Sequence, residues 1–179
     1  GTETLTIGFT ENGMFDASGT AAAQTQKINS VKLFDLSAPI ITESKLNSDN
    51  SKVTIRFSVP VYADAKASLT LEPDDFKLTL VGGTATLKST TPSSIDSSEN
   101  GKRYQLGLDV IGIPDGREVL TINPVDNNIY DDAANPANKV QDNNSMNLFD
   151  KQPPTITSIS LSKANDTLFV TLSEAAYAK

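Results

Sequence analysis

A tandem repeat constrains this chain more than any other feature of its sequence. The stretches Leu5–Asp35 and Leu120–Asp150 align without a gap at an offset of 115 residues. The same offset pairs Gly1 with Gly116 and Tyr62 with Tyr177, and roughly a third of the paired positions are identical. A fixed period of this length decides architecture before any single strand is assigned.

The period divides the chain into three parts. Residues 1–35 read as the end of a preceding repeat, residues 36–150 as one complete repeat, and residues 151–179 as the start of a following repeat. Together the two outer parts lack the equivalents of Ala65–Asp115, so two chains meeting head to tail could not complete a repeat from them. We therefore expect both ends to lie inside repeats of a longer array.

The hydrophobic pattern within one period is that of short strands. Phe76–Val81 and Val119–Pro124 alternate apolar and polar residues, as strands with one buried face do. No segment has a convincing amphipathic helical pattern, and Thr90–Gly101 reads as a Ser/Thr-rich loop. We predict an all-β fold, an antiparallel Greek-key β-sandwich of about seven strands. The other predicted strands are Ile40–Leu46, Val53–Ser58, Ala85–Ser89, Tyr104–Val110 and Ser145–Phe149.

Composition excludes several classes of function. The chain has no Cys, His or Trp, which removes disulfides, thiolate nucleophiles and Ser-His-Asp chemistry. Its net charge of −7 disfavours nucleic acid as a partner, and it has no apolar run long enough to span a membrane. The carboxylate pairs Asp74-Asp75 and Asp131-Asp132 read as ordinary surface acids, because adjacent strand residues point to opposite faces. We predict that the chain is not an enzyme.

Two short segments connect the repeats. Leu36–Pro39 corresponds to Lys151–Pro154, and each follows an aspartate, Asp35 or Asp150. Proline fixes φ and extends the residue before it, so each segment predicts a stiff joint. The neighbouring repeats of the same chain are then the first expected partners, and identical chains in a filament or lattice are the second.

Aromatic residues offer little for sugar binding. Phe57, Phe76 and Tyr104 stand at the apolar positions of alternating strands, which predicts a place in the core. Tyr62 and Tyr177 recur at the same position, which favours a packing role. The sequons Asn143-Asn144-Ser145 and Asn165-Asp166-Thr167 match an N-glycosylation pattern, although chance matches are expected in a chain rich in Asn, Ser and Thr.

A calcium site is one interpretation of the polar stretch after the strand Val119–Pro124. Calcium takes six to eight oxygen ligands from carboxylates, amides and carbonyls. The alternative is a solvated turn in which Asp and Asn favour bends. Glu174, across the joint from Asp150, is an additional oxygen donor. The carboxylates predicted to bind Ca²⁺, the one cofactor considered, are Asp126, Asp131, Asp132 and Asp150.

The period also resembles a known family. Four stretches are similar to the bacterial immunoglobulin-like repeats of very large secreted proteins: Ser37–Asp64, Phe76–Thr90, Tyr104–Leu108 and Glu118–Asn135. Such repeats occur in surface-layer proteins, adhesins and cell-surface filaments. The resemblance implies an immunoglobulin-like sandwich, an extracellular or cell-surface location and a spacer that tolerates calcium or is stiffened by it.

One loop departs from that family's pattern. The family has Asp-x-Ala-Gly-Asn, whereas this chain has Ala134 at the glycine position of Asp131–Asn135. A left-handed backbone costs energy at alanine, so we expect this loop to take another shape.

The sequence therefore predicts a structural repeat of a large extracellular protein, a rigid spacer and assembly unit. The alternative is an accessory module that attaches a secreted protein to a carbohydrate or a cell surface, which an exposed aromatic row or a groove would favour.

Overall fold

The computed structural model describes residues 1–178, and these residues form an all-β structure. The one helical element among them is a single 3-10 turn, η1 (Pro73–Asp75). The predicted all-β class is therefore confirmed. Within the described residues, no helix has the length and apolar character needed to cross a membrane.

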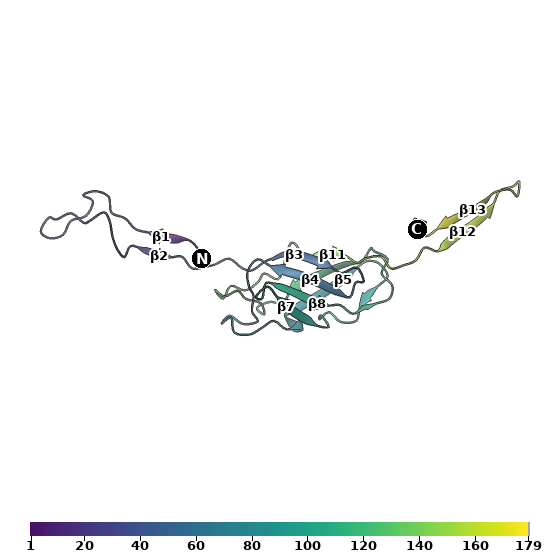
Figure 1. The fold of residues 1–179 in the computed structure, drawn as a ribbon, viewed down its shortest axis with the longest axis horizontal. Coiled ribbons are helices and arrows are strands. Elements are labelled where there is room, and N and C mark those ends of the chain that lie inside the picture. The colour runs from purple at the N-terminus through teal and green to yellow at the C-terminus, as the bar shows by residue number, and fades with distance from the viewer. Residues whose placement is uncertain (179) are drawn as a thin grey trace.

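Residues 36–150, the central segment, contain two main antiparallel sheets (Figure 1). One sheet has four strands in the order β3-β4-β8-β7, and the other has three strands in the order β11-β10-β5. A two-stranded pair, β6-β9, lies beside them. The bounds are β3 (Ile41–Leu46), β4 (Lys52–Phe57), β5 (Phe76–Val81), β6 (Thr86–Leu87), β7 (Ile95–Ser98), β8 (Arg103–Gly107), β9 (Val110–Ile111), β10 (Val119–Pro124) and β11 (Ser145–Asn147).

The core lies between the inner faces of these two sheets. Val53, Ile55 and Phe57 of β4 are buried on one side, and Leu120 and Ile122 of β10 are buried on the other. The residues that alternate with them in both strands are only half-buried, so each sheet has one buried face and one more solvent-accessible face.

The aromatic core predicted from the sequence is confirmed. Phe57, Phe76 and Tyr104 pack together, with ring centroids 6.1–6.4 Å apart. The Tyr104 hydroxyl donates a hydrogen bond to the Val61 carbonyl at 3.1 Å, which satisfies a polar group in an apolar setting. Burial raises the pKa of Tyr104 to about 12.

Two strand predictions were wrong in detail. Ile95–Ser98, placed in a loop by the sequence, is strand β7 at the edge of the four-stranded sheet. The predicted strand Tyr104–Val110 is two strands, because Leu108 and Asp109 leave the sheet between β8 and β9. The amide of Leu108 donates instead to the Ser51 carbonyl at 2.8 Å.

The outer segments are hairpins that reproduce the pairing of the central segment. In the first, β1 (Thr4–Thr6) pairs with β2 (Ser30–Lys32) in the register that β10 and β11 use 115 residues later. In the second, β12 (Ile156–Leu161) pairs with β13 (Leu168–Leu172) in the register of β3 and β4. The β-bulge near the start of β3 recurs at the equivalent place in β12.

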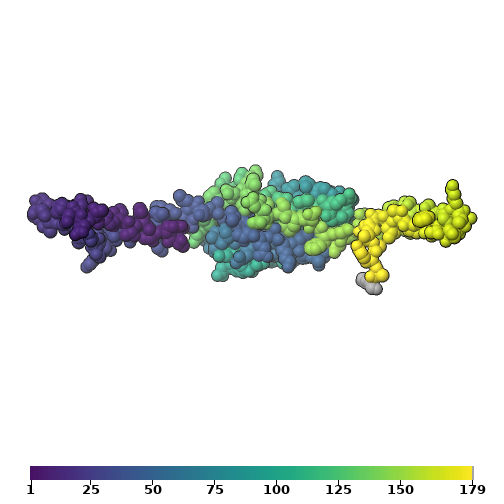
Figure 2. Space-filling view, turned by 90° about the horizontal axis from the view of Figure 1, so that it is seen from above, coloured from purple at the N-terminus to yellow at the C-terminus, as the bar shows by residue number. Residues whose placement is uncertain are grey.

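The three segments follow one another along an elongated molecule. The N-terminal segment leaves one end of the central segment and the C-terminal segment leaves the opposite end (Figure 1). The space-filling view shows the same linear order, with the central segment as the widest part (Figure 2). The functional question therefore concerns the two places where the segments join.

Candidate functional site

Both joints begin with the same turn. The Asp35 carboxylate accepts a hydrogen bond from the Ser37 amide at 2.9 Å, and the Asp150 carboxylate accepts one from the Gln152 amide at 2.8 Å. The Ser37 amide is the largest influence lowering the pKa of Asp35. An aspartate that accepts a hydrogen bond from the backbone amide two residues later fixes a turn, so the chain leaves the N-terminal segment and the central segment in the same way.

The proline that ends the first joint is part of the central segment. Pro39 is buried, and the amide of the next residue, Ile40, donates to the Ser58 hydroxyl at 3.2 Å. Thr155 and Ser173 make the equivalent bond at the second joint, at 2.9 Å. Pro154 is exposed there. The end of each joint is thus anchored to the strand pair that follows it.

The first joint touches a loop of the central segment. The side-chain amide of Asn135 donates to the Asp35 carbonyl at 3.2 Å. These two residues are 100 positions apart in the sequence. The loop Asp131–Asn135 therefore lies at the end of the central segment where the N-terminal segment enters.

Asp131 organises this loop. Its Oδ1 accepts hydrogen bonds from the amides of Ala133 at 2.9 Å and Asn135 at 2.8 Å, while Oδ2 accepts one from the Asn135 side chain at 2.9 Å. Asp131 is 2% exposed, so the prediction of a surface acid was wrong for this residue. Its burial is possible because three N–H groups solvate the carboxylate.

The expectation of a different loop shape was also wrong. Ala134 has a φ of +66°, in the left-handed region, as Gly19 has at the equivalent position with +83°. Asp16 accepts hydrogen bonds from the amides of Ser18 and Thr20, just as Asp131 does from their counterparts. The bonds to the aspartate offset the cost of the left-handed alanine, so both copies of the loop share one shape.

The second joint lies against the opposite end of the central segment. The Lys151 amide donates to the Pro114 carbonyl at 2.8 Å. A cavity of about 220 Å³ lies between the central segment and the C-terminal segment. It is lined by Asp115, Arg117, Asp150, Gln152, Ser173 and Glu174.

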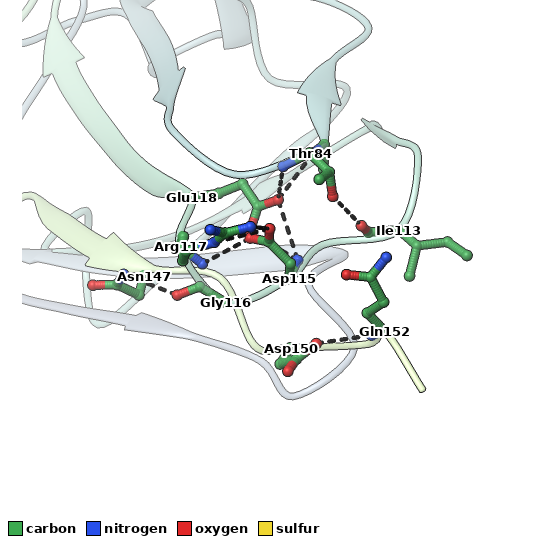
Figure 3. Close-up of polar contacts among 10 residues, drawn as sticks. Thr84, Ile113, Asp115, Gly116, Arg117, Glu118, Asn147, Asp150 and Gln152 are labelled. Atoms are coloured by element: carbon green, nitrogen blue, oxygen red, sulfur yellow. Dashed lines mark hydrogen bonds and ion pairs between the residues drawn. The ribbon is translucent and has the colours of Figure 1, made fainter. Parts of the chain in front are cut away.

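A buried glutamate holds this end together (Figure 3). Glu118 is 0% exposed, and its Oε1 accepts hydrogen bonds from the amides of Thr84 at 2.8 Å and Ala85 at 2.9 Å. The Asp115 amide donates to the same carboxylate at 3.1–3.2 Å. Burial on its own raises the pKa of Glu118, but the backbone hydrogen bonds, that of Ala85 foremost, outweigh it and the pKa is lowered.

Sequence reasoning missed Glu118. One signal could have found it, because Glu3 stands at the equivalent position of the other copy. A charged residue that recurs directly before a strand needs fixed partners when it is buried. Two of the partners, Thr84 and Ala85, come from the loop after β5, and the third, Asp115, lies directly before Gly116. None of the three has an equivalent in the other copy.

An ion pair between an exposed arginine and an aspartate with a largely buried side chain lies next to this carboxylate. Arg117 pairs with Asp115 through its side chain, and its amide also donates to the Asp115 carboxylate at 3.1 Å (Figure 3). Arg117 is the main cause lowering the pKa of Asp115. Glu174 faces the same cavity from the C-terminal segment, so charges of both signs meet at the second joint.

The structure does not gather the predicted calcium ligands in one place. Asp131 lies beside the first joint, whereas Asp150 lies at the second joint, at the other end of the central segment. Asp126 is exposed and forms an ion pair with Lys139 at 3.7 Å, and Asp132 is exposed. Within residues 1–178, no three acidic side chains converge on one point as metal ligands do. Calcium binding by these four residues stays a prediction.

The second pair of acids also divides into one exposed and one buried residue. Asp74 is exposed, as predicted, but Asp75 is 6% exposed. Asp75 accepts a hydrogen bond from the Glu72 amide at 2.8 Å at the start of η1. Burial raises the pKa of Asp75. Its role is to cap this turn at the start of β5.

Comparison with known proteins gives structural neighbours only. No protein-family model and no curated protein matches this chain. Among solved structures, it is similar to the N-terminal part of the bacterial S-layer protein SbsC, with 22% identity, a TM-score of 0.41 and 69% of this chain covered. Two longer SbsC structures, of residues 31–844 and of domains 1–6, give a TM-score of 0.39 with 23% and 22% identity. The match spans 26% of the first structure and 15% of each longer one.

Proposed function

We propose that this chain is a stretch of tandem immunoglobulin-like repeats that acts as a stiff structural spacer in a large extracellular or cell-surface protein. In this proposal, residues 36–150 are one complete repeat, residues 1–35 end the preceding repeat, and residues 151–179 begin the following one. The work of such a chain is mechanical. Each repeat adds to the length of the spacer, and the joints fix the orientation of one repeat relative to the next.

The strand order supports the immunoglobulin-like assignment. A constant-type immunoglobulin sandwich has strands A-B-E-D in one sheet and G-F-C in the other. If β3, β4, β5, β7, β8, β10 and β11 are named A to G in chain order, the observed orders β3-β4-β8-β7 and β11-β10-β5 become A-B-E-D and G-F-C. The connections between such sheets are of the Greek-key type.

The observation that carries the proposal is the repeated register. Leu5 pairs with Val31 as Leu120 pairs with Met146, and Leu161 pairs with Leu168 as Leu46 pairs with Val53. A one-residue slip would move every apolar side chain to the other face, so an identical register means an identical choice of buried face. The strand pairing of the outer hairpins therefore supports their assignment to neighbouring repeats of the same kind.

The exposed apolar residues of the outer hairpins fit this interpretation. Ile159 is 61% exposed and Val170 48% exposed. Ile55, the equivalent of Val170, is fully buried in the central segment. Two strands rarely hold without a third, so these faces require the remaining strands of their own repeats.

Mechanical unfolding of a concatemer of the 115-residue period tests the spacer function. Each repeat should unfold in one event of equal length, and an extended period spans at most roughly 380–410 Å. Negative-stain images of the native protein should show thin rods or a lattice built from rods, in which identical chains are the proposed lateral partners. Unfolding without a regular step, or a compact particle in the images, contradicts the proposal.

A further inference from the structure

We infer that Asn135 is an inter-repeat latch, which fixes the direction of the first joint by holding the last residue of the preceding repeat. The inference rests on the proposed function, because it assigns residues 1–35 and 36–150 to consecutive repeats. The inference is separate from the calcium interpretation of the same loop. Calcium would bind oxygen atoms, whereas the latch uses the N–H₂ group of the Asn135 side chain, which is a hydrogen-bond donor.

The latch makes two hydrogen bonds with one amide group. The Asn135 Nδ2 donates to the Asp35 carbonyl at 3.2 Å and to the Asp131 Oδ2 at 2.9 Å. Asn135 is half-buried and Asp35 is half-buried as well. A single side chain therefore connects the end of one repeat to Asp131, the aspartate that organises the next repeat's loop.

The donor is held in place before it meets the joint. The backbone amide of Asn135 donates to Asp131 Oδ1, and the side-chain amide of Asn135 donates to Oδ2 of the same carboxylate. Ala134 keeps a φ of +66° between them. Strain of this kind persists only where surrounding bonds over-determine it, and it collects at functional sites.

The acceptor is held as well. Asp35 forms its own turn with the Ser37 amide, and Ser37 lies only two residues before buried Pro39. Leu36 is 85% exposed, so side-chain packing does not restrain that residue. The polar contact from Asn135 is thus the restraint that prevents the joint from swinging between Asp35 and Pro39.

The preceding copy of the loop lacks the latch residue. The loop Asp16–Thr20 has the same backbone bonds as Asp131–Asn135, but Thr20 replaces the asparagine and lacks its amide donor. Its hydroxyl lies 3.1 Å from the Ser18 hydroxyl instead. We therefore expect the joint before a repeat to be latched where asparagine occupies this position and unlatched where threonine does.

Backbone ¹⁵N relaxation of the whole 179-residue chain tests the latch. Asn135→Thr introduces the residue of the earlier copy, and Asn135→Asp keeps the size but replaces the donors with acceptors. In both variants, order parameters at residues 35–38 should fall from about 0.85 toward 0.6. Order within residues 41–124 should not change. Asn138→Thr, a nearby exposed asparagine, is the matched control and should leave residues 35–38 as ordered as before.

Unchanged order at residues 35–38 in either Asn135 variant overturns the latch, as does an equal loss in the Asn138 control. The spectrum itself reports whether the central repeat remains folded. A failure of the spacer function would appear in the unfolding steps or the images, while the joint dynamics would be unaffected, so the two failures are distinguishable.

Discussion

Asn50 and Phe149 lie 99 residues apart in sequence and exchange two hydrogen bonds, each 2.8 Å long. The Asn50 side chain donates to the Phe149 carbonyl and accepts from the Phe149 amide, as a neighbouring strand would. Asn50 is 3% exposed and has a φ of +63°, which asparagine tolerates better than most residues. These two hydrogen bonds between Asn50 and Phe149, here called the clasp, fix the chain just before the second joint.

Loss of the clasp should destabilise the central segment. Asn50→Ala removes both bonds and places an alanine in the left-handed region, so we expect a loss of about 1–3 kcal/mol in the free energy of unfolding. Urea titration followed by fluorescence of the buried tyrosine measures it. Asn100→Ala is the matched control, because Asn100 lies in the same segment with a similar backbone geometry at φ +54° but is exposed. Equal effects of the two substitutions would show that the clasp has no energetic role.

The buried carboxylate of Glu118 should make stability depend on pH. Its pKa in the folded state is lowered from the ordinary value of 4.5. Its contribution to the free energy of unfolding is therefore fully present above the ordinary pKa, and it is lost as the pH falls through the lower pKa of the folded state. Melting temperatures measured from pH 7 down to about pH 3 should fall across this window.

Glu118→Gln should remove this pH-dependent component. The substitution turns an amide N–H₂ toward backbone N–H donors, and we expect a loss of about 1–3 kcal/mol at pH 7. The difference in the free energy of unfolding between the variant and the wild type should become smaller as the pH is lowered. Glu3→Gln, at the equivalent exposed position, should have little effect. If the difference in unfolding free energy were the same at all pH values, the ionised carboxylate would be excluded as the stabilising form.

Gly83 should tolerate no side chain. It has a φ of +57°, and a Cβ there would overlap the carboxylate group of Glu118. Gly83→Ala combines a left-handed alanine, at about 1–2 kcal/mol, with a clash of about 1–3 kcal/mol. Gly112→Ala isolates the first effect, because Gly112 lies in the same segment with a φ of +90°, and a Cβ there would come no closer than 3.6 Å to Thr84 and Ala85. The thermal shift should be much larger for Gly83→Ala, and similar shifts would contradict the clash.

Chelation tests the calcium prediction. A ligand bound only to the folded state raises its stability, so excess chelator should lower the melting temperature and added Ca²⁺ should restore it. Asp131→Asn should abolish the difference if the loop beside the first joint is the site. A melting temperature that chelator does not change would contradict calcium binding by Asp126, Asp131, Asp132 and Asp150.

The best strand predictions were those with strict alternation. β5 and β10 have the predicted bounds, because both sit in a sheet with one buried and one exposed face. β7 gave no such signal. Ile95 is its one large apolar residue, and as an edge strand it is held by backbone bonds to β8. Backbone pairing of this kind depends on a partner that the local sequence does not reveal.

The joints were found from the sequence, but their contacts were not. Asp35, Asp150 and Pro39 were identified because they recur with the period or close the connecting segment. Asn135 and Glu118 act through partners far away in the sequence. Asp131 was predicted to be exposed, because only the folded loop shows that three N–H groups surround its carboxylate.

The sequence by itself determined the period, the all-β class and the aromatic core of Phe57, Phe76 and Tyr104, since alternation and repetition are properties of the chain alone. The tertiary structure decided which polar groups are buried and which end of the central segment each one holds. The physical reason is that a buried carboxylate or amide is stable only with hydrogen-bond partners. Here those partners come from strands and loops up to 100 residues away, which only the folded chain brings together.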